Sequence, residues 1–265
     1  MPNYCNNTLR VETVRNNKVS KNQLKQFIED VCDKGEVASL KEAKEVRKKH
    51  LEENLNTEYR DNVELYVKHK KMSIKKFMTE VLGFEFDKEK EEFFKDRSEF
   101  SMNKILPTPE ELRKVTAPVR AENGETEEEF KARVKRHQKL YGASDWYEWN
   151  CANWGTKWDA CDVSFEDISS TEVSYFFNTA WSPICPFLET IGKMYPLLKF
   201  SLYCEESGND FAGDYVVESG EVTEDETRSC PVTCGCCGEE LEEGEELNDD
   251  GDCPSCAEDN NDDDE

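Results

Sequence analysis

The sequence VSYFFNTAWSPICPFLETIGKMYPLLKFSLYC, residues 173–204, contains a strand, a helix and a second strand in direct succession. Val173–Thr179 is rich in β-branched and aromatic residues on both sides, which is typical of a central strand. In residues 183–195 the apolar side chains recur at helical spacing. Leu198–Cys204 then alternates apolar and polar residues, which predicts a strand with one buried face. This unit therefore predicts a helix packed on a sheet.

The N-terminal part of the chain predicts a second unit of the same kind. Residues 4–14 alternate like a strand, and residues 21–34 switch to helical spacing, with Gly35 as the expected C-cap. Phe100–Leu106 is expected to be a short strand that ends at the following prolines. Strand, helix and strand thus occur twice, which is the split β-α-β pattern. We predict an α+β fold, a ferredoxin-like sandwich, where the name describes topology alone.

The stretch from about residue 36 to residue 99 is dense in lysine and glutamate. Thin apolar stripes over 40–55 and 74–82 predict two or three exposed helices inserted between core elements. A capping box of Thr126 and Glu129 predicts the start of a further helix that ends near Gly142.

Negative charge is concentrated at the C-terminus. The whole chain has a formal charge of −25, and residues 221–265 contain 19 acidic residues and one basic residue, a balance of −18. Such a segment repels phosphate and attracts basic surfaces. A solubilising tail and a binding segment both fit this composition.

Two C-x-x-C pairs lie within this acidic end, Cys234 with Cys237 and Cys253 with Cys256. Pairs at this separation match a four-cysteine zinc ribbon, in which each pair lies in a tight turn and both sulfurs face one ion. Four thiolates close the coordination shell, so we expect a structural zinc ion. Cys230 and Cys236 are spare, and the register of the ligands could shift to either.

Four of the five tryptophans lie between Trp146 and Trp158. Trp154, Lys157, Trp158 and Asp159 form a possible binding surface, because exposed aromatic rings beside a cation can stack on nucleic-acid bases. A role in the core or in a turn is the alternative, and the sequence favours it because tryptophans usually bury their large rings.

Five blocks of sequence occur in order over roughly residues 1–220: Pro2–Asn7, Phe100–Pro109 (FSMNKILPTP), Asn153–Asp159 (NWGTKWD), Thr179–Pro183 (TAWSP) and Phe211–Gly213. Together these blocks resemble the YubB-type ferredoxin-like proteins of phages and plasmids. The resemblance implies a ferredoxin-like fold and an origin in a mobile element, and it implies no activity or catalytic residue.

The sequence favours a non-enzymatic role. It has three histidines, each in a lysine-rich helical stretch, and it contains no phosphate-binding glycine loop and no nucleophile elbow. No apolar run approaches the ~20 residues of a membrane span, and no signal peptide is evident, so we expect a protein of the host cytoplasm without membrane contact.

These observations predict the following organisation: a ferredoxin-like domain over 1–220, an acidic linker over 221–229, a zinc-ribbon-like module over 230–258 and an acidic tail over 259–265. The leading hypothesis is an accessory protein of a phage or plasmid whose acidic zinc-bearing arm binds a basic host protein. The alternative is a nucleic-acid-associated enzyme or factor that uses the tryptophan-rich block.

Overall fold

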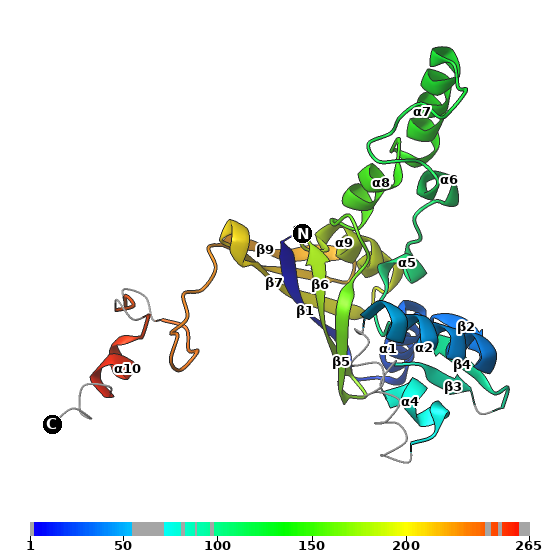
Figure 1. Ribbon diagram of the computed structural model, residues 1–265. Coiled ribbons are helices and arrows are strands. Elements are labelled where there is room, and N and C mark those ends of the chain that lie inside the picture. The colour runs from blue at the N-terminus through cyan, green and yellow to red at the C-terminus, as the bar shows by residue number, and fades with distance from the viewer. Residues whose placement is uncertain are drawn as a thin grey trace.

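Two antiparallel sheets organise the computed structural model, which describes residues 3–54, 72–80, 83–87, 89–95, 98–241, 245–248 and 251–259 (Figure 1). The larger sheet has the strand order β5-β6-β1-β7-β8-β9, and every neighbouring pair is antiparallel. Its strands are β1 (Tyr4–Thr13), β5 (Cys161–Ser169), β6 (Glu172–Ala180), β7 (Leu198–Glu206), β8 (Phe211–Glu218) and β9 (Glu221–Arg228).

The connections of this sheet follow the split β-α-β pattern. Helix α1 (Lys18–Val31) follows β1, and helix α9 (Cys185–Met194) connects β6 to β7. The order β1-α1-β5-β6-α9-β7, with β1 between β6 and β7, is that of a ferredoxin-like sandwich. The hairpin of β8 and β9 adds two strands beside β7. The predicted α+β class is confirmed, and the sheet is antiparallel throughout its described pairs.

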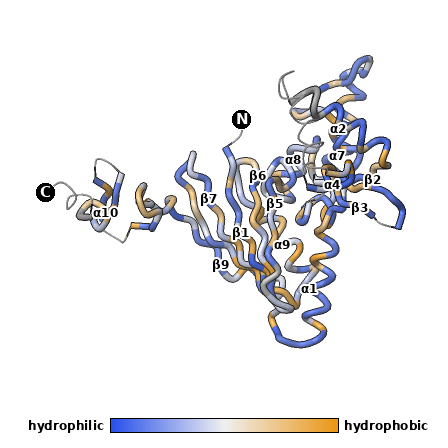
Figure 2. The backbone as a smooth tube through the Cα atoms, turned by 60° about the horizontal axis from the view of Figure 1, so that its bottom comes forward, coloured by the Kyte–Doolittle hydropathy of each residue, from blue (hydrophilic) through white to orange (hydrophobic). Residues whose placement is uncertain are grey.

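The main core lies between this sheet and its two helices. Phe27 of α1 packs edge-on against Tyr175 and Phe200, with ring centroids 6.3 and 5.3 Å apart. Phe187 and Leu188 of α9 are fully buried in the same cluster. Along β7 the burial alternates strictly, as the sequence predicts, and Figure 2 shows hydrophobic and hydrophilic residues alternating along the strands.

In the ferredoxin-like order, the strand that follows β1 and α1 is β5. The prediction of a strand at Phe100–Leu106 is wrong. That stretch forms the short helix α5 (Met102–Ile105). The carboxylate of Asp159 accepts hydrogen bonds from Ser101 Oγ (2.6 Å) and from the Met102 backbone N–H (2.8 Å). These contacts satisfy donors at the start of a helix, which an isolated sequence window does not reveal. Phe100 is nevertheless in the core, stacked on Phe177 at 4.8 Å.

The charged insertion contains the smaller, three-stranded sheet. The sequence predicted only helices in this region, and the sheet was missed. Its helices are α2 (Leu40–Asn54) and α4 (Ile74–Glu80), as expected. One short strand precedes α2 and two follow α4; they pair in the order β2-β4-β3 and are too short to show a period in sequence. The strands are β2 (Glu36–Ser39), β3 (Glu85–Asp87) and β4 (Glu92–Lys95). Part of each expected apolar stripe, at residue 55 and at 81–82, lies outside the described residues.

A separate core holds this insertion together. Met78 and Phe93 are fully buried, and Phe84 is nearly so, in a cluster with Ala38 and Ala43. This cluster is distinct from the main core, so burial within the insertion itself holds its elements together.

Helix boundaries are set by polar caps. The helix expected over 21–34 begins at Lys18, because the Asn17 side chain accepts the Ser20 N–H, and it ends at Val31 with an extended Cys32. Gly35 has a positive φ of 73° but lies beyond the helix, so its assignment as C-cap is wrong.

Three helices follow the insertion and α5. They are α6 (Glu110–Arg113), α7 (Glu127–Tyr141) and α8 (Trp146–Asn153). The capping box of Thr126 and Glu129 at the start of α7 and the left-handed C-cap at Gly142 are both confirmed. In Figure 1, α7 and α8 extend away from the sheet.

The expected acidic linker over 221–229 is instead the edge strand β9. It pairs with β8 from Glu218 opposite Glu221 to Ala212 opposite Arg228, and every residue of β9 is exposed. The sequence does not reveal this strand, because nearly all its side chains are polar and so apolar and polar residues do not alternate along it. No helix in the described part of the chain is both long and apolar enough to cross a membrane.

Candidate metal centre

The first cysteine pair lies in a tight turn at the end of a short hairpin. Thr233 and Glu240 form an isolated antiparallel bridge, and the Leu241 N–H donates to Val232 O at 2.9 Å. Within the turn, the Gly238 N–H donates to Cys234 O at 2.9 Å. Gly238 has a φ of 73°, a conformation that side chains with a Cβ rarely adopt. The glycine directly after the pair thus permits the turn.

The second pair lies where a loop enters helix α10 (Pro254–Asp259). The loop is closed by the Gly251 N–H donating to Asn248 O at 3.0 Å, and Asn248 Oδ1 accepts the Asp252 N–H at 2.8 Å. Cys253 precedes the helix and Cys256 lies within it. The start of the helix therefore lies between the two cysteines of this pair.

One backbone contact joins the two turns. The Gly235 N–H donates to Gly251 O at 2.8 Å, and a Cβ at Gly235 would lie 3.1 Å from that oxygen. Close approach of the two backbones therefore favours glycine at position 235. This contact brings cysteines that are far apart in sequence to the same point.

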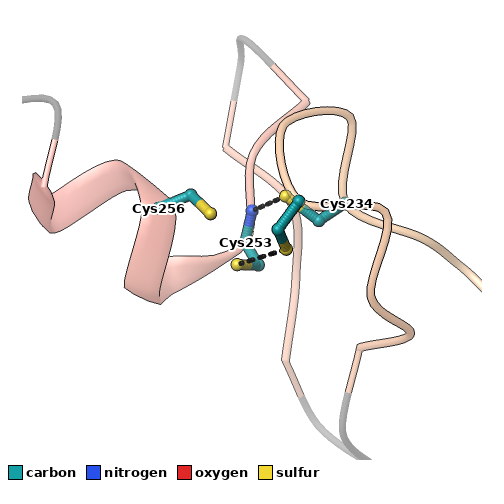
Figure 3. Close-up of side chains that lie close together, drawn as sticks. Cys234, Cys253 and Cys256 are labelled. Atoms are coloured by element: carbon teal, nitrogen blue, oxygen red, sulfur yellow. Dashed lines mark hydrogen bonds between the residues drawn. The ribbon is translucent and has the colours of Figure 1, made fainter.

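The four predicted ligands converge. The sulfurs of Cys234, Cys237, Cys253 and Cys256 all lie within 4.8 Å of one another. Figure 3 shows Cys253 and Cys256 on the α10 side facing Cys234 on the hairpin side. Cys237 Sγ lies 3.9 Å from Cys253 Sγ. Four sulfurs around one ion at ~2.3 Å would lie about 3.8 Å apart, so a small contraction of this cluster gives a tetrahedral site.

Backbone amides are directed at the buried sulfur. The N–H groups of Cys253 and Cys236 donate to Cys234 Sγ at 3.1 and 3.4 Å. Backbone hydrogen bonds from Cys237 and then Cys253 lower the pKa of the Cys234 thiol to about 6. Contact with the thiol of Cys253 raises the pKa of Cys256. This donor set, with four soft sulfurs and amides that stabilise negative charge, fits a zinc ion or another thiophilic metal.

The two spare cysteines, Cys230 and Cys236, are not among the four that converge. Cys230 Sγ donates to Phe211 O at 3.2 Å, and its N–H donates to Asp210 Oδ1 at 3.0 Å. Cys230 is therefore tied to the sheet. Cys236 is exposed; its N–H donates to Cys234 Sγ, and its thiol contacts that of Cys256 without belonging to the set of four.

The expected binding surface in the tryptophan-rich block divides into buried and accessible residues. Trp154 is 3% exposed and donates its indole N–H to Leu106 O at 2.9 Å, so it belongs to the core. The carboxylate oxygens of Asp159 accept hydrogen bonds from residues at the start of α5. Lys157 is half-buried, with its Nζ 3.7 Å from the ring centre of Trp158, which is 45% exposed. Trp154 and Asp159 are therefore held by contacts within the protein, although both line a cavity together with Lys157 and Trp158, which are more accessible.

Two adjacent cavities lie at this block, with volumes of about 310 and 650 Å³. Trp146, Lys157 and Trp158 line both. Asn103 and Arg113 also line the smaller cavity, and sequence reasoning missed them because they lie more than forty positions before Lys157.

Residues 153–249 match the family described as "Ferredoxin-like domain in Api92-like protein". The match runs from the end of α8 through β9 and includes the first cysteine pair. It identifies a ferredoxin-like domain in this part of the chain. Among solved structures, a protein Api92 from Yersinia pseudotuberculosis aligns with 10% identity and a TM-score of 0.41, over 87% of this chain and 99% of that chain. The search of curated proteins finds no match.

Proposed function

We propose that the protein is a non-enzymatic binding protein whose C-terminal arm, residues 230–265, holds a structural zinc ion and binds a basic surface on a protein partner. The observation that carries this proposal is the convergence of four cysteine sulfurs inside a strongly acidic segment. A four-sulfur site leaves no position for water or substrate, which makes the ion structural.

Zinc gives the arm a fixed shape. Leu241 and Leu247 are among its few apolar residues, so burial contributes little to its folding. The apparent free energy of zinc binding to small four-ligand peptides is ~10–16 kcal/mol, which is enough to order such a segment. The ion thereby turns a polar stretch of chain into a defined surface.

The charge of the arm selects the partner. Residues 230–265 contain 15 acidic residues and no basic residue. In Figure 1 the described part of the arm extends away from the sheet beyond β9. Dense negative charge on a protruding module accelerates and orients association with a basic surface. The resemblance to proteins of phages and plasmids adds that the partner belongs to the host and meets this protein in the cytoplasm.

The test compares three proteins in affinity capture from host lysate at low salt. These are the full chain, a chain that ends at Ser229 and so keeps β9, and the double variant Cys253→Ser, Cys256→Ser. We expect basic proteins to be captured by the full chain and released as salt rises, with strong loss in the other two. Equal capture by the chain that ends at Ser229 would refute a role for the arm. Capture by the double variant at the level of the full chain would refute the need for the metal.

A further inference from the structure

The accessible tryptophans line a cleft that the arm does not explain. The cleft consists of the two adjacent cavities, one against α5 and α6 and the other against α8 and residues 117–119. Trp146, Lys157 and Trp158 line both, so the two cavities are adjacent and share these side chains as a wall. Cavities of 310 and 650 Å³ are in the range of small-molecule sites.

The cleft is built on fixed polar contacts. Asn150 accepts the Thr108 hydroxyl at 2.7 Å and donates to Lys157 O at 2.8 Å. Both Asn150 and Thr108 are buried. These bonds hold the floor of the cleft and the backbone of Lys157 in one arrangement, so little ordering is needed when a ligand enters.

Aromatic faces form the shared wall. Trp158 is 45% exposed, and Trp146 is partly exposed and packs edge-on against Tyr147 with centroids 6.0 Å apart. Large rings left open to solvent in a concave site offer stacking surfaces for a planar group.

Positive charge lies at the smaller cavity. Arg113 and Lys157 both line it, and no ion pair involves either of them among the described residues. Arg113 donates one N–H to Asn103 Oδ1, which leaves further donors of its guanidinium for a ligand. The carboxylate of Asp159 also lines this cavity, but it accepts four hydrogen bonds, from Ser101, Met102, Asn103 and Ala160.

Negative charge lies at the larger cavity, lined by Asp145 and Glu148. Asp145 accepts the N–H groups of Val119 and Glu148, and Glu148 accepts the N–H and hydroxyl of Ser144. This polarity orients a ligand, because an anionic group is favoured beside Arg113 and disfavoured beside Glu148.

We propose that this cleft binds a nucleobase together with its phosphate, the base stacked on Trp158 or Trp146 and the phosphate paired with Arg113 and Lys157. The same chemistry is offered by a free mononucleotide and by a nucleotide within a single strand. The proposal stands apart from the function proposed for the arm, since none of the arm residues that the structure describes lines either cavity.

The experiment uses the full chain and four probes at low salt: adenosine monophosphate, adenosine, inorganic phosphate and an oligothymidylate of ten nucleotides. Equilibrium dialysis measures binding, and tryptophan fluorescence excited at the red edge reports stacking. We expect saturable binding and quenching by the monophosphate or the oligonucleotide. Adenosine is expected to bind about tenfold or more weakly than the monophosphate, since it lacks the charged group that Arg113 contacts. Tighter binding of the oligonucleotide than of the monophosphate identifies a single strand as the source, and the reverse identifies a free nucleotide.

Matched variants locate the site. Trp158→Ala is expected to weaken binding about tenfold or more, as removal of a stacking ring does, whereas Trp181→Ala, which removes a ring that is 48% exposed outside the cleft, should leave it unchanged. Arg113→Gln should weaken binding and reduce its salt dependence, and Lys139→Gln on α7 should do neither. The absence of saturable binding by both the monophosphate and the oligonucleotide would overturn the proposal. So would equal losses in Trp158→Ala and Trp181→Ala, with circular dichroism showing both variants folded.

Discussion

Cys236 and Cys256 have different roles, because Cys256 is one of the four converging cysteines and Cys236 is not. Cys256 contributes a sulfur, whereas Cys236 contributes its backbone N–H to Cys234. We therefore predict that Cys256→Ser reduces bound zinc from one ion per chain to nearly none, and that Cys236→Ser keeps it. Native mass spectrometry after purification in zinc measures both. Loss of zinc in Cys236→Ser as well would show that the ligand register differs from the one described.

Glu125, which lies just before α7, forms an ion pair with Arg133 within that helix. The carboxylate accepts two guanidinium N–H groups at 2.8 and 2.7 Å and the Glu122 backbone N–H at 2.9 Å. The Arg133 side chain is the main cause that lowers the pKa of Glu125 from 4.5 to about 2. A carboxyl with a lowered folded pKa stabilises the fold above its unfolded pKa and loses that contribution as pH falls toward the folded value.

We predict that Glu125→Gln lowers the urea midpoint at pH 7, and that this effect shrinks below about pH 4.5 and disappears near pH 2. Glu128→Gln, an exposed change in the first turn of the same helix, serves as the control and should have a smaller effect. A difference between wild type and Glu125→Gln that stays constant from pH 7 to pH 3 would contradict the pairing.

The four cysteines of the candidate metal site could be predicted because they lie in two short motifs with fixed spacing. Arg113 and Asn103 could not, because they contribute to the cleft from a different part of the chain and carry no local signal. The same limit explains Asp159. Its sequence position suggests an exposed turn, but its function is to accept the N–H groups at the start of α5.

At the scale of elements, β9 protects the edge of the sheet. It pairs along β8, and its acidic side chains make it a poor template for another strand. We predict that a chain ending at Ser229 keeps the thermal midpoint of the full chain. A chain ending at Ser219 lacks β9, leaves the apolar strand β8 as the new edge, and should have a lower midpoint and aggregate.

Differential scanning fluorimetry and light scattering on the two truncated chains measure this prediction. Equal midpoints and equal scattering would show that β9 contributes nothing to the sheet, and would restore its interpretation as a linker.

Elements with a clear period were predictable, and those without one were not. β7 and α9 show their alternation and helical spacing openly, because one face of each is apolar. β5 was missed because it is largely polar and its pairing with β6 shifts register between Cys161 and Ser164. The insertion strands have three or four residues each, which is too few for alternation to be distinguished from chance.

At the scale of the whole molecule, the topology was predicted although one of its strands was misplaced. The count of two strand-helix-strand units was right, and β5 takes the place that the sequence assigned to Phe100–Leu106. The error arose because a strand and a short helix ending before proline look alike in apolar content over seven residues.

The body and the arm depend on different stabilising interactions. The body has large buried clusters, whereas the arm has the cysteine site and few apolar residues. We predict that a strong zinc chelator makes residues 230–259 sensitive to limited proteolysis and leaves fragments that end near Arg228 intact, as mass spectrometry of the products would show.

The double variant Cys253→Ser, Cys256→Ser is the control for this prediction, because its arm should be cut at the same rate with and without chelator. Unchanged cleavage of the wild-type arm after chelation would show that the arm keeps its structure without metal.

The central position of β1 determines the order in which the protein can be assembled during synthesis. Asn7 of β1 hydrogen-bonds Thr179 of β6, 172 positions later. At bacterial and eukaryotic translation rates, roughly 10–35 s separate the appearance of these two residues. During that time the first strand has no partner on either side, while the insertion can already close its own small core. The polar residues on its other face, Thr8, Arg10 and Glu12, are therefore expected to keep a nascent chain from pairing with its neighbours on the same messenger.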